Sequence, residues 1–189
     1  MQEWNPAAWL DSPCFAPLAP ALEALGRDRR TWPSWAELNA LVGSAQGEVA
    51  NAQGMPIRFV PQREGKRAFW QHYEPGIFRW GEVPTRAGNW HDFFNALVWL
   101  TFPKSKAAIN EAHVRAMWAA RRRTTPQDSQ RGRLRDALTL FDEGGVIVVS
   151  ASAALSDLLR QFRWKDLFWD ARAQVLTDMR FIVFGHGLY

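Results

Sequence analysis

Apolar residues recur at helical spacing over much of the second half of the chain. Residues 90–100, 105–123 and 126–141 each keep their apolar positions three or four residues apart, which predicts three consecutive helices. The third stretch ends at Gly144 and Gly145, where a left-handed helix cap forms easily. This part of the sequence therefore predicts the main core.

The first half of the chain shows a weaker pattern. Two short helices are expected at residues 18–25 and 34–42, and a Ser-x-x-Glu capping box beginning at Ser34 marks the start of the second. A brief alternation at residues 57–60 is consistent with a strand. Residues 63–88 mix charges, glycines, prolines and aromatics without a clear period, so we predict irregular structure there.

Two continuous apolar runs near the C-terminus predict strands. One extends from Val146 to Val149 and the other from Phe181 to Phe184, with two separate helical phases between them. Two helices of similar length carry the chain away and back, so the second strand should run antiparallel to the first. This topology would place His186 at the same edge of the sheet as Asp142 and Glu143.

The predicted fold class is α/β or α+β, mainly helical, with a small sheet that includes both runs in antiparallel orientation. The 189 residues suit a single domain. Within it, the Pro-rich residues 1–62 are expected to pack on a core formed by residues 89–189.

Composition excludes a disordered acidic tail, a collagen-like repeat and a disulfide scaffold. Apolar residues make up 47% and charged residues 22%, which are values of a folded globular chain. The single cysteine, Cys14, cannot form an intrachain disulfide, which favours a reducing cytoplasm. We expect no secretory signal, because the N-terminus has no basic segment ahead of an apolar one. We also expect no membrane span, because no apolar run approaches the roughly 20 residues that a spanning helix needs.

The helix predicted at residues 90–100 carries one polar stripe, formed by His91, Asp92 and Asn95. An imidazole and a carboxylate that converge can bind a metal or exchange protons with a substrate. The alternative is structural: Asn89 would cap the helix, Asp92 would favour its dipole, and His91 would form a hydrogen bond at the edge of the core.

Further polar residues flank the two predicted strands. Asp142 and Glu143 come directly before the first strand, where paired carboxylates can bind a divalent cation or simply end a helix. His186 follows the second strand between two glycines, where the backbone can approach a ligand closely. The candidate metal ligands are therefore His91, Asp92, Asp142, Glu143 and His186, and the candidate catalytic residues are His91, Asp92, Asn95 and His186.

One basic cluster offers an alternative function. The chain carries a formal charge of +4, and six arginines fall within fifteen residues. Nucleic acid or another polyanion is a partner that such a cluster could bind, although a solvated surface is the simpler interpretation. The candidate nucleic-acid contacts are Arg121, Arg122, Arg123 and Arg131.

Three blocks of sequence resemble one bacterial family. They extend from Asn89 to Trp99, from Phe141 to Gly145 and from Phe184 to Leu188, and they are similar to the family of domains of unknown function numbered 3025. The similarity covers roughly residues 70–189. It implies no reaction, cofactor or catalytic residue.

Three hypotheses follow from these patterns. The first is a cytoplasmic bacterial enzyme, a hydrolase assisted by a divalent metal that the His and Asp residues bind. The second is a nucleic-acid or polyanion-binding module, and the third is a structural or interaction protein. The hydrolase hypothesis requires antiparallel strands and a short distance from His186 to His91 and Asp142.

Overall fold

The computed structural model describes residues 4, 12–26, 29–45, 47–62, 65, 68–122 and 132–189. The chain divides into two compact units, Met1–Gly145 with Phe184–Tyr189, and Val146–Val183. The fold is mainly helical, as the apolar spacing predicts, and it contains two small two-stranded sheets where one was expected. Among the described residues, no helix is both long and apolar enough to cross a membrane.

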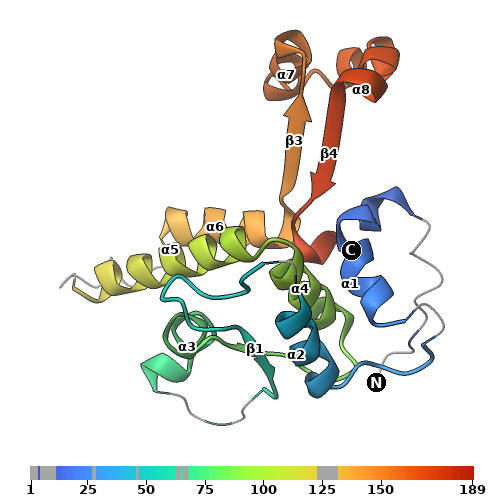
Figure 1. The fold of residues 1–189 in the computed structure, drawn as a ribbon. Coiled ribbons are helices and arrows are strands. Elements are labelled where there is room, and N and C mark those ends of the chain that lie inside the picture. Colours follow the sequence, from blue (N-terminus) through green and yellow to red (C-terminus); the bar gives the residue numbers. More distant parts are fainter. Residues whose placement is uncertain are drawn as a thin grey trace. The chain divides into compact units, whose positions relative to one another are not determined.

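Helix α4 (Trp90–Thr101) is the most buried helix of the first unit, because every side chain from Asp92 to Trp99 is buried. Helix α5 (Pro103–Arg121) follows at once, since Pro103 suits the first helical position, where its missing N–H group is not needed. Helix α6 (Arg133–Gly144) packs along α5 (Figure 1). The three helices predicted in this region are thus present. The third ends at Gly144 instead of residue 141, and residues 126–131 of its predicted range lie outside the described residues.

The N-terminal residues add two helices to the first unit. Helix α1 (Ala19–Ala24) follows the 3₁₀ helix η2 (Pro13–Leu18), so the helix predicted at residues 18–25 is shorter than expected. Helix α2 (Trp35–Ser44) begins with the predicted capping box, in which the Ser34 side chain accepts a hydrogen bond from the backbone of Glu37. Its N-terminus is therefore fixed by local sequence.

The prediction of irregular structure at residues 63–88 is wrong. This segment contains η3 (Phe69–Gln71), helix α3 (Tyr73–Trp80) and strand β2 (Glu82–Pro84), which pairs in parallel with β1 (Arg58–Val60). Pro75 is the reason that no helix is predicted here, because proline usually interrupts helices. In α3 it lies in the first turn, where backbone N–H groups have no partner within the helix. Gly76 allows this turn to approach the Trp70 carbonyl oxygen, which would lie 3.2 Å from an added Cβ.

The second unit is a two-stranded sheet with short helices at one end (Figure 1). Strands β3 (Val146–Ser150) and β4 (Met179–Val183) are antiparallel, as predicted, with Val146 opposite Val183. Between them lie α7 (Ala153–Arg160), the π-helical turn η5 (Asp166–Asp170) and α8 (Arg172–Asp178). Their apolar faces enclose a small core formed by Leu155, Leu167, Val175 and Met179.

Three glycines join the end of α6 to the C-terminal 3₁₀ turn η6 (His186–Leu188). The left-handed cap expected at the end of α6 is wrong, because Gly145 is extended. Glycine is needed there for space: an added Cβ would lie 2.4 Å from the carbonyl oxygen of Phe141. A Cβ on Gly185 or Gly187 would likewise lie 2.5 Å or 2.9 Å from backbone atoms of α6. This close backbone contact sets the position of His186.

Candidate metal centre

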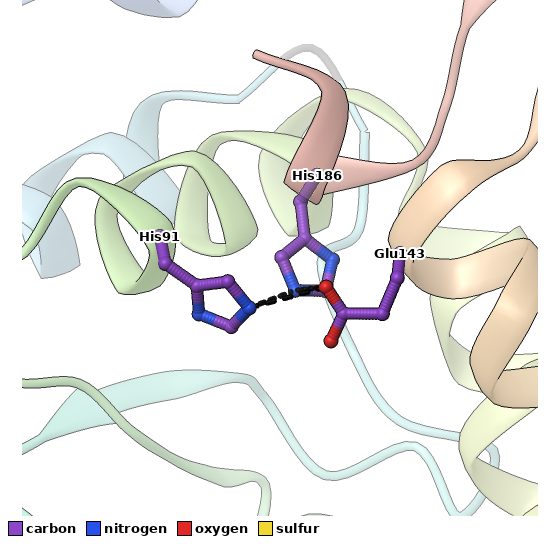
Figure 2. A group of neighbouring side chains, drawn as sticks. All are labelled: His91, Glu143 and His186. Carbon is purple, nitrogen blue, oxygen red and sulfur yellow. Dashed lines mark hydrogen bonds and ion pairs between the residues drawn. The ribbon is translucent and has the colours of Figure 1, made fainter.

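Three side chains from separate elements converge in the first unit. His91 lies in the first turn of α4, Glu143 lies in the last turn of α6, and His186 begins η6. His91 Nε2 lies 3.2 Å from Glu143 Oε2 and 3.2 Å from His186 Nε2, and the third side of the triangle, from His186 Nε2 to Glu143 Oε2, is 3.4 Å (Figure 2). Two imidazoles and one carboxylate form a common ligand set for catalytic zinc.

The size of this triangle fits a tetrahedral ion. Ligands on a tetrahedral zinc ion with bonds of about 2.05 Å lie about 3.3 Å apart. Ligands at right angles on an octahedral ion with bonds of about 2.1 Å lie about 3.0 Å apart. The three distances between ligand atoms, 3.2, 3.2 and 3.4 Å, agree better with the tetrahedral case.

Asp92 orients the ring of His91. Its Oδ1 lies 3.1 Å from His91 Nδ1, and both carboxylate oxygens also accept hydrogen bonds from the side chain of Arg86 at 2.8 and 2.9 Å. Partial burial acts to raise the pKa of Asp92, but the hydrogen bonds from Arg86 outweigh it, and the net pKa is lowered. The carboxylate therefore stays ionised and can accept a hydrogen bond from His91 Nδ1. In that tautomer, Nε2 of His91 carries the free electron pair.

His186 also faces a carboxylate, but at a distance longer than a hydrogen bond. Its side chain is 3% exposed, and its Nδ1 faces Asp142 Oδ2 at 3.7 Å. That nitrogen has no hydrogen-bond partner among the described residues. Burial, reinforced by the positive charge of Lys106, lowers the pKa of His186 to about 4, so the ring is neutral at pH 7. A neutral imidazole is the form that binds a metal ion.

Lys106 connects the centre to a buried polar network. Its ammonium donates to both carboxylate oxygens of Asp142, at 2.6 and 2.8 Å, and to Asn95 Oδ1 at 2.8 Å. Asn95 Nδ2 in turn donates to the Tyr73 hydroxyl at 2.7 Å. A lysine that is only 4% exposed is stable here because all three of its N–H groups have acceptors.

A cavity of about 400 Å³ opens in front of the three ligands. Glu74 also lines this cavity, and its Oε2 accepts a hydrogen bond from Asn110 at 2.7 Å. Burial raises the pKa of Glu74 to about 7. The volume is sufficient for a small-molecule ligand. Its lining comprises Gln62, Tyr73, Glu74, Pro84, Arg86, His91, Asp92, Asn95, His113, Thr139, Asp142, Glu143 and His186.

The structure brings the predicted residues together but gives them different positions. His91, Glu143 and His186 point their ligand atoms at one another. Asp92 and Asp142 lie behind them, each paired with a basic side chain, and Asn95 bridges Lys106 and Tyr73. Asn89 also caps α4, with its Oδ1 accepting from the backbone of Asp92 at 3.0 Å, so the cap expected in the structural alternative is present.

Several residues of the site were not predicted. Lys106, Asn110 and His113 are buried along one face of α5, spaced four and three residues apart. This spacing was visible in the sequence, but polar residues at helical spacing usually form a solvated face. Tyr73 and Glu74 lie in the segment predicted to be irregular, where no pattern marks them as neighbours of the site.

Of the candidate nucleic-acid contacts, the two that the structure describes do not line this cavity. Arg121 and Arg122 are exposed at the end of α5, and the Arg121 guanidinium lies 4.2 Å from the centre of the Phe69 ring. Arg123 and Arg131 lie outside the described residues.

Comparison with known families identifies the chain. Residues 57–189 match the family described as "Protein of unknown function (DUF3025)", so the chain belongs to this family. The match begins about a dozen residues before the region that the sequence blocks indicated. No curated protein and no solved structure matches the chain.

Proposed function

We propose that the chain is a metal-dependent hydrolase in which His91, Glu143 and His186 bind a zinc ion. The convergence of the three ligand atoms carries this proposal. If each imidazole bears its proton on Nδ1, facing Asp92 or Asp142, then two bare ring nitrogens and a carboxylate oxygen meet at 3.2–3.4 Å. Three such acceptors repel one another unless a proton or a cation lies between them.

The surroundings of the ligands support a catalytic role. Structural zinc sites are closed by four protein ligands, whereas catalytic sites have three and leave a position for water or substrate. Here three ligands face a cavity of about 400 Å³. The fourth position of a tetrahedral ion would therefore be open to solvent and to a substrate.

Hydrolysis also requires a group that accepts and returns a proton. A bound zinc ion lowers the pKa of a coordinated water to about 7. Zinc held by the three side chains would supply such a water as the nucleophile toward a carbonyl carbon or phosphorus. Glu74 would then accept one proton from the water and return it to the leaving group as the bond to that group breaks. Glu74 suits this role because it lines the same cavity and its pKa is about 7.

Metal binding is tested first. The full chain is stripped with a chelator, and zinc affinity and stoichiometry are measured by titration calorimetry. We expect one zinc ion per chain, and an affinity at least about 100-fold weaker for His91→Ala and for His186→Ala. His72→Ala is the matched control, because His72 is exposed and does not line the cavity. Melting curves of the metal-free variants confirm that each is folded.

The reaction class is tested separately. We expect the zinc-loaded chain to hydrolyse activated esters or phosphate esters such as p-nitrophenyl acetate and p-nitrophenyl phosphate. A chelator should abolish this activity, zinc should restore it, and Glu74→Gln should reduce it while zinc still binds. Equal zinc affinity in the two histidine variants and the wild type would refute the metal centre. Selective binding of iron(II) with consumption of oxygen would refute the hydrolase, because the same ligand set occurs in iron oxygenases.

A further inference from the structure

The hydrogen-bond network behind the metal centre fixes the direction of one proton. Lys106 can only donate, so Asn95 must present its carbonyl oxygen to the ammonium. The amide nitrogen of Asn95 is then the atom that faces the Tyr73 hydroxyl, at 2.7 Å. Because an amide N–H can only donate, the Tyr73 oxygen is the acceptor in this contact.

The hydroxyl hydrogen of Tyr73 must therefore point elsewhere. Among the described residues, the only hydrogen bond of this hydroxyl is the one from Asn95, and Tyr73 lines the cavity that contains the three metal ligands. A phenol O–H that accepts one hydrogen bond from the protein keeps its own hydrogen for a partner in the cavity. Burial, with the charge of Glu74 in addition, raises the pKa of Tyr73 well above its usual value, so the hydroxyl keeps its proton.

The position of Tyr73 suits a substrate bound to the metal. Asn95, its partner, lies one helical turn after the ligand His91 on the same face of α4. Tyr73 lines the same cavity as the three ligands. A tetrahedral group that binds zinc through one oxygen directs its other oxygens into this cavity, where the Tyr73 hydroxyl is a donor.

On this basis, and resting on the proposed function, we propose that the Tyr73 hydroxyl donates a hydrogen bond to the substrate oxygen that becomes negative during hydrolysis. The substrate class is then a carbonyl or phosphoryl compound whose attacked centre carries that oxygen. No bond to Tyr73 forms or breaks. Asn95 and Lys106 are positioning residues, because they fix the direction of the donor before the substrate binds.

Inorganic phosphate, a tetrahedral anion, serves as the probe. Zinc affinity and phosphate affinity are measured separately on the full chain loaded with zinc. We expect Tyr73→Phe to leave zinc affinity within about twofold and to weaken phosphate binding about 10-fold or more, as for other hydrogen bonds to charged groups. The sequence contains two tyrosines, so Tyr189→Phe, which lies outside the cavity, is the matched control.

A second variant tests the direction of the proton. In Asn95→Asp, the carboxylate still accepts from Lys106 but now accepts from Tyr73 as well, so the hydroxyl hydrogen turns away from the cavity. Introducing Tyr73→Phe into this background should therefore change phosphate affinity by less than about twofold. The double-mutant cycle removes the effect of the added charge, which is present in both members of that comparison.

The outcomes separate the two proposals. If the wild-type chain binds no zinc, the proposed function fails. If zinc binds but phosphate does not, or if Tyr73→Phe binds phosphate as well as wild type, the role of Tyr73 is refuted while the metal centre stands. An equal loss from Tyr73→Phe in both backgrounds also refutes it, because the hydroxyl would then act without the orientation that Asn95 sets.

Discussion

Glu74 should make the stability of the metal-free protein depend on pH. Burial raises its pKa from 4.5 to about 7, and Lys106, Asp142, Asn110 and Arg135 also act on it. At a pH between these two pKa values, the unfolded chain has lost the Glu74 proton while the folded chain still keeps it. The folded state therefore binds more protons, and its stability falls as pH rises from about 4.5 to 7.

The size of this effect follows from the shift. Raising the pKa of Glu74 from 4.5 to about 7 corresponds to a free-energy cost of about 3 kcal/mol for ionising the group in the folded chain. Water in the cavity screens part of this cost, so we expect about 1–2 kcal/mol. Glu74→Gln keeps an oxygen that accepts the hydrogen bond from Asn110 and removes the charge. The variant should equal the wild type near pH 4.5 and exceed its stability by about 1–2 kcal/mol at pH 8.

The measurement is the free energy of unfolding in urea, with a chelator present, at several pH values between 4.5 and 8. The difference in free energy of unfolding between variant and wild type isolates the contribution of Glu74, because His186 and the other groups that titrate are present in both proteins. Glu111→Gln, in an exposed ion pair with Arg115 on α5, controls for the loss of one negative charge. A stability difference that does not grow with pH, or a variant less stable than wild type at pH 8, would contradict the assignment of a buried, readily protonated carboxyl group.

Three further predictions concern the supports of the metal centre. Asp92→Asn should weaken zinc binding about 10-fold to 100-fold, because the carboxylate no longer fixes the tautomer of His91, whereas Asp157→Asn in an exposed ion pair should have no effect in the same titration. Lys106→Met should lower the free energy of unfolding at pH 7 by about 3 kcal/mol, because it leaves Asp142 without its cation; a loss below about 1 kcal/mol would argue against a tight pair. Gly185→Ala should weaken zinc binding and lower the melting temperature, because the added Cβ would lie 2.5 Å from the backbone nitrogens of Gly144 and Gly145. Gly144→Ala should change neither quantity, because its added Cβ would have no atom within 4 Å.

Local patterns were sufficient to predict much of the framework. The apolar spacing of α4 and α5, the β-branched run of β3 and the two helical phases after it are all signals within one element. The antiparallel pairing followed from counting helices between strands, and it returns the chain to Gly145, whose carbonyl oxygen accepts from the backbone of Phe184 and of Gly185. This return is the reason that His186 could be placed near Glu143 from sequence.

Other parts of the site depend on contacts between residues far apart in the sequence. Lys106 is a residue that a helix normally exposes, and its burial is stable only because Asp142, 36 positions later, accepts two of its hydrogen bonds. The helix that begins at Tyr73 contains Pro75 and Gly76, which usually interrupt helices, and it is stabilised by burial of Ile77 and Phe78 against the rest of the unit. Neither feature has a local signature.

The difference between the predicted ligand set and the three side chains that converge has a geometric cause. The two acidic residues predicted as ligands, Asp92 and Asp142, are each adjacent in sequence to a residue that does point into the centre. Successive residues of a helix point about 100° apart, so two neighbours cannot both direct their side chains at one ion. His91 and Glu143 face the centre, and their neighbours instead meet Arg86 and Lys106. A His-Asp or Asp-Glu pair on a helix can therefore provide one ligand and one residue that supports a ligand, and the cation beside each carboxylate shows which member is the support.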